Sequence, residues 1–272
     1  MAVTAYEVDS GAAVVTLTNG AAGNVLNHES LGSLQAALNR AASDPDVRVV
    51  VLRAEGDSFC LGMDLSLVRA GAADPGLAKE TVGQYTALLA AIQDSAKPVV
   101  AVVHGAVKAG GIGLAGACDI VLASEGATFE FSEVILGLIP ANVIPFLAGA
   151  RVPAQVLKYL ILTAKRLDAA EALAVNLVDE VFSQAQLAAG AKAVVKTLLR
   201  ASPRALAEAK RFFSQLARQT REEASAKAQA KLLELIQDPE VLAAIQAFED
   251  GLTPSWFSKY QPKHPLAPQG GS

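Results

Sequence analysis

Two continuous apolar runs in this chain each lead into a glycine-bearing loop, and this arrangement constrains the fold more than any other feature. Residues 49–52 (VVVL) precede a loop at 59–64 (FCLGMD), and residues 99–103 (VVAVV) precede a loop at 104–113 (HGAVKAGGIG). Uninterrupted valine-rich runs are typical of parallel strands that are buried on both faces of a sheet. Two such loops can aim two backbone N–H groups at one oxygen atom, and an oxyanion hole of this kind stabilises a thioester enolate.

Strand-like and helix-like patterns alternate over the first part of the chain, which predicts an α/β fold with parallel βαβ units. A hairpin of strands is expected within residues 1–20, and a helix that carries Tyr85 is expected over about 77–92. After Pro153 the pattern becomes mostly helical, because apolar residues recur at helical spacing. Long amphipathic helices are predicted at 186–200, 203–216 and 220–236.

These patterns divide the chain into a core, a helical appendage and a tail. The core is predicted over residues 1–195, and a helical region that mediates oligomerisation is predicted over 196–260. The apolar stripes of those helices need a surface to bury against, either in their own core or on a neighbouring subunit. Residues 261–272 are rich in proline and glycine, so we expect a disordered tail there.

Composition excludes several classes of protein. With 52% hydrophobic and 18% charged residues, the chain can bury a sizeable core. The net charge is −4 and no basic stripe is present, so no nucleic-acid partner is expected. No apolar run approaches the roughly 20 residues of a membrane span, and two cysteines make no disulfide framework. We therefore expect a cytoplasmic protein without a membrane partner. No metal partner is expected either, since the three histidines lack metal-ligand spacing.

Several short motifs, in this order and spacing, resemble those of the crotonase (enoyl-CoA hydratase/isomerase) superfamily. The matching segments are NVLN at 24–27, DPDVRVVVL at 44–52, FCLGMDL at 59–65, CDI at 118–120, EVILGLIP at 133–140, and SP at 202–203 followed by Lys210. The resemblance covers about residues 5–260. It implies an α/β crotonase spiral of repeated ββα units, with C-terminal helices that assemble a homotrimer or hexamer.

The resemblance also assigns the site. It implies that the backbone N–H groups of Met63 and Gly110 form the oxyanion hole and that Glu133 is the catalytic acid or base. Hydratases of the superfamily use two acids to hold one water molecule, and the position that matches the second acid here is Gly113. Glu133 has apolar neighbours in the sequence, and burial that raises its pKa would suit it to proton transfer.

Six further residues are candidates for binding the substrate. Gly62 and Gly111 lie beside the two expected donors, and Asp64 is expected to hold the first loop by hydrogen bonds. The other three could meet a polar group at the far end of an acyl chain: Lys108, Asn142 and Tyr85. A solvated surface lysine is at least as good an interpretation of Lys108, and packing is the preferred interpretation of Tyr85.

Four segments are most similar to one subgroup, the PksH-like dehydratases of polyketide β-branching (HMG-synthase) cassettes. They are AGGIG at 109–113, SE at 132–133, LIPANVIPFL at 138–147 and EDGLTPSW at 249–256. The subgroup implies dehydration of a 3-hydroxy-3-methylglutaryl thioester to a 3-methylglutaconyl thioester. The substrate would be carried on the phosphopantetheine of acyl carrier protein or coenzyme A, without a cofactor. Alternatives are an enoyl-CoA hydratase, a Δ3–Δ2 enoyl-CoA isomerase, or a non-catalytic assembly protein of the same fold.

Overall fold

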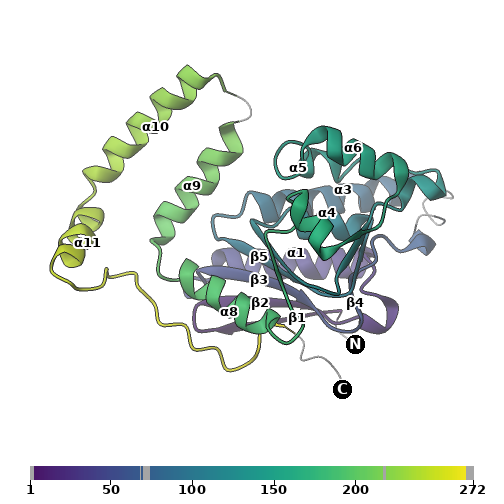
Figure 1. Cartoon of the computed structure of the whole chain (residues 1–272), viewed down its shortest axis with the longest axis horizontal. Coiled ribbons are helices and arrows are strands. Elements are labelled where there is room, and N and C mark those ends of the chain that lie inside the picture. Colours follow the sequence, from purple (N-terminus) through teal and green to yellow (C-terminus); the bar gives the residue numbers. More distant parts are fainter. Residues whose placement is uncertain (1–2, 68, 70–73, 217–218, 268–272) are drawn as a thin grey trace.

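The computed structural model describes residues 3–67, 69, 74–216 and 219–267. They form a layered α/β core and a helical arm that stands away from it (Figure 1). Among the described residues, no helix is long and apolar enough to cross a membrane.

A six-stranded sheet runs through the core in the order β1-β2-β3-β5-β7-β10. The first two strands form the predicted antiparallel hairpin, and every later pairing in this sheet is parallel. The strands are β1 (Thr4–Asp9), β2 (Ala12–Leu17), β3 (Val49–Ala54), β5 (Val99–Val103), β7 (Ile120–Ser124) and β10 (Glu180–Phe182). The two apolar runs of the sequence are thus adjacent strands, and the loops that follow them start side by side.

A second sheet contains the strands that follow β3, β5 and β7 in the chain, together with β9. Its order is β4-β6-β8-β9, with bounds β4 (Ser58–Cys60), β6 (Ala106–Lys108), β8 (Thr128–Glu130) and β9 (Leu167–Asp168). From β3 to β8, each pair of successive strands therefore contributes one strand to each sheet before helical structure follows. This arrangement confirms the predicted spiral of repeated ββα units.

The helices of the core cover both faces of the large sheet. They are α1 (His28–Ser43), α3 (Pro75–Gln93), α4 (Gly110–Gly116), α5 (Ile144–Leu147), α6 (Ala154–Thr163), α7 (Ala169–Ala174) and α8 (Leu187–Leu198), with short 3-10 turns η1 (Gly20–Ala22) and η2 (Glu133–Leu136). Because side chains alternate along a strand, Val50 and Leu52 pack with α1 and α3, whereas Val49 and Val51 pack with α8. Each fully buried side chain of this size contributes about 1.5–3 kcal/mol.

The C-terminal tail differs from its prediction as far as the structure describes it. Leu266 and Ala267 are buried against the α8 face of the sheet, in the same cluster as Tyr260. Two hydrogen bonds hold the segment there, from Lys263 N–H to the Asp9 carboxylate and from the Arg53 guanidinium to the carbonyl of residue 265. The composition misled the prediction because the proline-rich segment is stabilised by contacts with residues far away in the sequence. Positions 268–272 lie outside the described residues.

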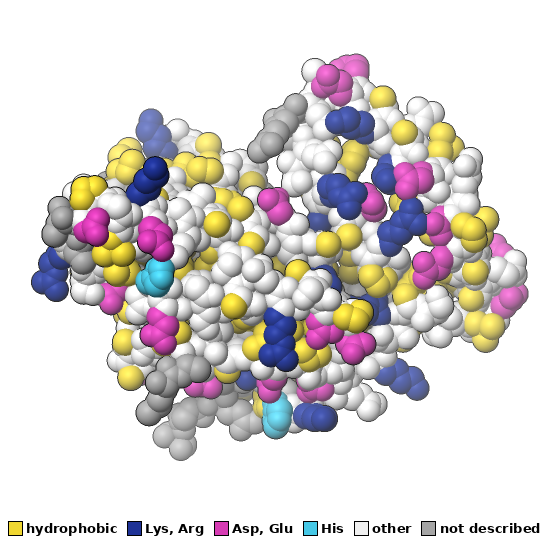
Figure 2. Space-filling model, turned by 180° about the vertical axis from the view of Figure 1, so that it is seen from behind, with side chains coloured by type: hydrophobic (Ala, Val, Ile, Leu, Met, Phe, Trp, Pro, Cys, Tyr) yellow, Lys and Arg dark blue, Asp and Glu magenta, His cyan; other side chains and the backbone are white. Residues whose placement is uncertain are grey.

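The arm consists of α9 (Pro203–Leu216), α10 (Arg221–Ile236) and α11 (Pro239–Glu249), of which the sequence patterns predicted the first two. The predicted boundary at residue 195 falls inside α8, whose residues up to Leu199 are packed on the core. The arm buries little of its own surface, since no side chain of α9 or α10 is buried. In Figure 2 it forms the lobe on the right, with apolar side chains exposed along it.

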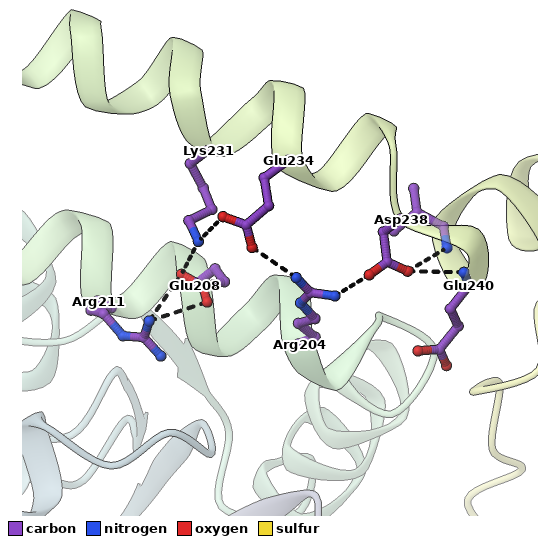
Figure 3. Close-up of polar contacts among 8 residues, drawn as sticks. Arg204, Glu208, Arg211, Lys231, Glu234, Asp238 and Glu240 are labelled. Atoms are coloured by element: carbon purple, nitrogen blue, oxygen red, sulfur yellow. Dashed lines mark hydrogen bonds and ion pairs between the residues drawn. The ribbon is translucent and has the colours of Figure 1, made fainter.

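Ion pairs join the helices of the arm to one another (Figure 3). Arg204 at the start of α9 pairs with Glu234 near the end of α10 and with Asp238, which caps the start of α11. The helices α9 and α10 therefore run antiparallel. Farther along, Lys231 of α10 pairs with Glu208 of α9 and with Glu234. These pairs are exposed, so salt screens them and each one stabilises the arm only weakly.

One ion pair ties the arm to the core. Lys210 of α9 lies 2.5 Å from the Asp119 carboxylate, and its ammonium also donates to the carbonyl of Lys97. The same Asp119 oxygen accepts the backbone N–H of Val99 at the start of β5. Burial raises the pKa of Asp119, and Lys210 opposes that shift. The cation therefore stabilises a largely buried carboxylate that also fixes the start of a central strand.

We predict that Lys210→Met destabilises the protein by about 1–3 kcal/mol, because it leaves the Asp119 carboxylate without its nearest cation. Lys227→Met changes an exposed lysine of α10 in the same way and is the matched control. Chemical denaturation of both variants measures the difference. Equal stability of the two variants would contradict this account of the junction.

Candidate active site

The first loop is held by a short bridge to residue 26. The N–H of Leu26 donates to the Gly62 carbonyl at 2.8 Å, and the N–H of Asp64 donates to the Leu26 carbonyl at 2.9 Å. Met63 lies between these two bonds in a parallel bridge with Leu26. The backbone alternates in direction along an extended segment, so the N–H of Met63 points away from Leu26.

The second loop lies directly against the first because Gly62 has no side chain. Gly62 has φ +88°, and a β-carbon on it would lie 2.9 Å from the β-carbon of Ala109 and 3.1 Å from the nitrogen of Gly110. On the opposite side of the contact, a β-carbon on Gly111 would lie 2.3 Å from the Cys60 carbonyl oxygen. Both glycines are therefore required for the approach of the two backbones.

The seven-residue helix α4 begins at Gly110, and all of its residues are buried. Ala109, just before it, has φ +48° and ψ −122°, a conformation that L residues rarely adopt. Strain of this kind costs on the order of 1–3 kcal/mol and persists where the surrounding structure imposes it. Here it sets the direction of the Gly110 N–H, which is at the N-terminus of the helix and has no partner within it.

Met63 and Gly110 both line one cavity of about 380 Å³. Its walls are mostly apolar and come from the first loop, α3 and the segment after η2. The polar side chains that line it are Thr81, Tyr85, Ser132, Glu133 and Asn142. The structure thus brings the two expected donors and the expected acid to the same cavity.

Glu133 begins η2 on the wall of this cavity. Burial raises the pKa of its carboxyl group above the ordinary value of 4.5. Its Oε2 atom is buried and has no hydrogen-bond partner within the part of the chain that the structure describes. A carboxylate in this state is poorly solvated and is therefore suited to accept a proton from a bound substrate.

The remaining candidates separate into those at the cavity and those away from it. Asn142 lines the cavity, and its amide donates to Thr86 Oγ1 at 2.9 Å and to the Val82 carbonyl at 3.1 Å. Lys108 is not among the lining residues that the structure describes, and its ammonium pairs with Glu130 at 3.0 Å. The proposed contact of Lys108 with the substrate is therefore not supported, since β6 directs this side chain to a neighbouring strand.

Two residues have structural roles at the loops. Asp64 accepts the N–H of Ser66 at 2.8 Å. The pKa of its carboxyl group is lowered by hydrogen bonds from Ser66, first from the side chain and then from this N–H. Asp64 fixes the first loop, as the sequence predicted. Cys60 is fully buried, and burial raises its pKa to about 12. The thiol therefore stays protonated and is not a nucleophile.

Tyr85 of α3 is buried, with 4% of its surface exposed, and its hydroxyl donates to the Gly110 carbonyl at 2.5 Å. Thr81 lies one helical turn earlier on the same face of α3, and sequence reasoning missed it. The i, i+4 spacing from Tyr85 was the available signal. The described residues contain no cluster of three or more His, Cys, Asp or Glu side chains that could hold a metal ion.

Comparisons with known proteins identify the family of this chain. The sequence model of the family "Enoyl-CoA hydratase/isomerase" matches residues 7–259. The enoyl-CoA hydratase domain-containing protein 3 of Danio rerio is 29% identical and covers 93% of this chain and 87% of that protein. A putative enoyl-CoA hydratase of Thermus thermophilus is 34% identical over 74% of this chain and 79% of that protein.

A solved structure, a putative enoyl-CoA hydratase/isomerase (crotonase) from Legionella pneumophila, superimposes with a TM-score of 0.88. It is 30% identical and covers 94% of this chain and 99% of that one. The chain therefore belongs to the crotonase superfamily, in its enoyl-CoA hydratase/isomerase family, and is an enzyme of that family. The names of these relatives carry no sign of the PksH-like subgroup that the sequence resembled.

We predict that Gly62→Ala lowers kcat by about 10²-fold or more, because an added β-carbon separates the loops and displaces one oxyanion donor. Gly32→Ala on α1, where a β-carbon meets nothing within 4 Å, is the control. Steady-state kinetics, with thermal unfolding to verify the fold, distinguish the two variants. A Gly62→Ala enzyme with wild-type kcat would contradict the assigned role of the loops.

Glu133→Gln is expected to lower activity by about 10²–10⁴-fold while leaving the protein at least as stable. Burial raises the folded-state pKa above 4.5, so ionised Glu133 opposes folding increasingly as pH rises through that pKa. The neutral amide removes this cost at neutral pH. For the same reason, wild-type activity should fall at low pH with an apparent pKa above the usual pKa of glutamate. A less stable Glu133→Gln protein would indicate a structural carboxylate instead.

Proposed function

We propose that this enzyme is a hydratase-type lyase that adds water to, or removes it from, the α and β carbons of an acyl thioester. The observation that carries the proposal is the meeting of Met63, Gly110 and Glu133 at one cavity. Each of the three supplies what such a reaction requires: two donors for the developing charge on the thioester oxygen and one group to carry the proton.

In the dehydration direction, the thioester carbonyl would accept hydrogen bonds from the N–H groups of Met63 and Gly110. Glu133 takes the α-proton, and the electron pair of the broken C–H bond moves onto the thioester oxygen. The N-terminus of α4 favours the negative charge that forms there. When the enolate collapses, the bond between the β carbon and its hydroxyl breaks, and Glu133 returns the proton to that oxygen. Water and the enoyl thioester are the products.

The lining of the cavity suggests which acyl groups fit. It is mainly apolar, and no lysine or arginine is among the lining residues that the structure describes. A 3-hydroxy-3-methylglutaryl group carries a distal carboxylate, whose burial without a cation is costly. A neutral acyl chain is therefore the better substrate, with Asn142 and Ser132 available for a hydroxyl group. Coenzyme A and acyl carrier protein present the same phosphopantetheine arm, and the chemistry needs no cofactor.

A second candidate is a Δ3–Δ2 enoyl-CoA isomerase. It is favoured by Gly113, which leaves the position of the second hydratase acid without a carboxylate. An isomerase moves one proton between two carbons, and one carboxylate suffices for that transfer. The two reactions differ in whether water is a reactant.

The first experiment is mass spectrometry of four thioesters after incubation with enzyme. They are a 3-hydroxyacyl-CoA, a Δ3-enoyl-CoA, and the 3-hydroxy-3-methylglutaryl group on coenzyme A and on carrier protein. Loss of one water from the hydroxyacyl-CoA supports the proposal. Conversion of the Δ3-enoyl-CoA to a product of equal mass, resolved by liquid chromatography before mass spectrometry, identifies an isomerase. Loss of water only from the glutaryl group on carrier protein would identify the β-branching dehydratase. Absence of all three reactions would refute the proposed function, and Glu133→Gln is the negative control.

A homotrimer or a hexamer is part of the same proposal, as is a cytoplasmic location, which rests on two unpaired buried cysteines. The assembly is supported by the apolar surface of the arm. Phe213 of α9 is 73% exposed and Phe248 of α11 is 76% exposed. Exposed aromatic residues on a thin helical arm are typical of a surface that a neighbouring subunit covers.

We predict that Phe248→Asp produces a smaller particle, because it places a charge in the apolar contact between subunits. Gln246→Asp puts the same charge on an exposed polar position of α11 and should leave the assembly intact. Light scattering coupled to size-exclusion chromatography measures both masses. A monomeric wild-type protein, or a Phe248→Asp variant of unchanged mass, would contradict the proposal.

A further inference from the structure

The glycine at position 113 has a steric explanation in the structure. A β-carbon on Gly113 would lie 2.2 Å from the hydroxyl oxygen of Tyr85, closer than real β-carbons approach a neighbour. The next atom, Cγ2 of Val143, would be 2.8 Å away. The space that any side chain at 113 would need is therefore already filled, chiefly by the phenol.

The hydroxyl of Tyr85 makes a specific contact from this position. It donates to the carbonyl of Gly110, 25 residues away, at 2.5 Å. Gly110 also lines the cavity, and its N–H is one of the two proposed oxyanion donors. Tyr85 therefore binds the carbonyl of the same residue whose N–H is proposed to bind the thioester oxygen. Burial raises the pKa of Tyr85 well above its ordinary value, and the phenol remains protonated and able to donate.

The backbone next to Gly110 explains why a hydrogen bond from Tyr85 is needed at this position. Ala109 has a rare, strained backbone conformation, and α4 is only seven residues long. A short helix that begins at a strained residue has few internal bonds to fix its first turn. The hydrogen bond from α3 supplies such a constraint from outside the helix, at the residue where the donor must be aimed.

We propose that Tyr85 is a positioning residue for the oxyanion hole and that Gly113 is the glycine that makes room for its hydroxyl. The inference deepens the proposed function and rests on it, because it concerns the same thioester oxygen. In this account the position of the second acid is not simply vacant. A side chain there and the Tyr85–Gly110 hydrogen bond exclude each other.

The Tyr85→Phe variant distinguishes a tyrosine that only packs in the core from one that positions the oxyanion donor. Tyr85 belongs to the main apolar core, and phenylalanine would retain its ring packing. Only the hydrogen bond to Gly110 is lost in Tyr85→Phe. The exposed Tyr159 of α6 supplies a matched Tyr→Phe control, and Gly83 of α3 supplies a matched Gly→Ala control, since a β-carbon there meets nothing within 4 Å.

The test uses the full chain, with turnover and the binding of acetoacetyl-CoA as separate readouts. The enolate of this thioester absorbs in the near ultraviolet, so its fraction reports how well the bound oxyanion is stabilised. Tyr85→Phe should lower kcat by about 10–100-fold and reduce the enolate fraction, with KM and probe affinity changed by less than about two-fold. Tyr159→Phe should change neither.

A double-mutant cycle tests the role of Gly113 independently. Gly113→Ala should lower kcat by about 10-fold or more in the wild-type background, because the methyl group displaces the hydroxyl. The same change should cost much less when Tyr85 is already phenylalanine, and the two effects should not add. Gly83→Ala should have no effect in either background.

Several outcomes would overturn the inference. Wild-type kcat and a wild-type enolate fraction in Tyr85→Phe would do so, as would a loss confined to thermal stability or probe affinity. Additive effects of Tyr85→Phe and Gly113→Ala would remove the assigned role of Gly113. A wild-type enzyme that neither binds the probe nor converts any thioester would instead refute the proposed function, and the inference with it.

Discussion

The close approach of two backbone loops is the constraint on which the rest of this site depends. Gly62 lies where a β-carbon would be 2.9 Å from Ala109, and Gly111 lies where one would be 2.3 Å from the Cys60 carbonyl. Glycine is required at both positions because main chain faces main chain. The sheets make the approach possible, since β3 pairs with β5 and β4 pairs with β6. The spiral therefore brings the backbones of Met63 and Gly110, the two proposed oxyanion donors, to one cavity.

The site also contains features that oppose folding locally. Glu133 is partly buried, with one oxygen that has no hydrogen-bond partner among the described residues, and Ala109 has a strained backbone. Both are tolerated because a large buried core on the two faces of the main sheet stabilises the chain elsewhere. Features of this kind concentrate at active sites, where a raised pKa and a fixed donor direction serve the chemistry.

Much of this arrangement could be predicted from the sequence, and the limits have physical causes. Continuous valine runs identified the central strands, and the superfamily's motifs predicted a shared site for Met63, Gly110 and Glu133, which line one cavity. Lys108 was assigned to the substrate because of its position in the loop, but β6 places it beside Glu130. The packing of residues up to 267 on the core depends on partners more than 200 positions away, as the Arg53 bond to residue 265 illustrates. Local composition contains no information about such contacts.

The central claim is that Glu133 removes an α-proton while Met63 and Gly110 stabilise the resulting enolate. Deuterium incorporation at the α carbon of a 3-hydroxyacyl-CoA in heavy water, followed by NMR, tests this claim most directly. The account predicts rapid incorporation with the wild-type enzyme and a loss of it both in Glu133→Gln and in Gly62→Ala. Incorporation that persists in Glu133→Gln, or that is absent from an otherwise active wild-type enzyme, would contradict it.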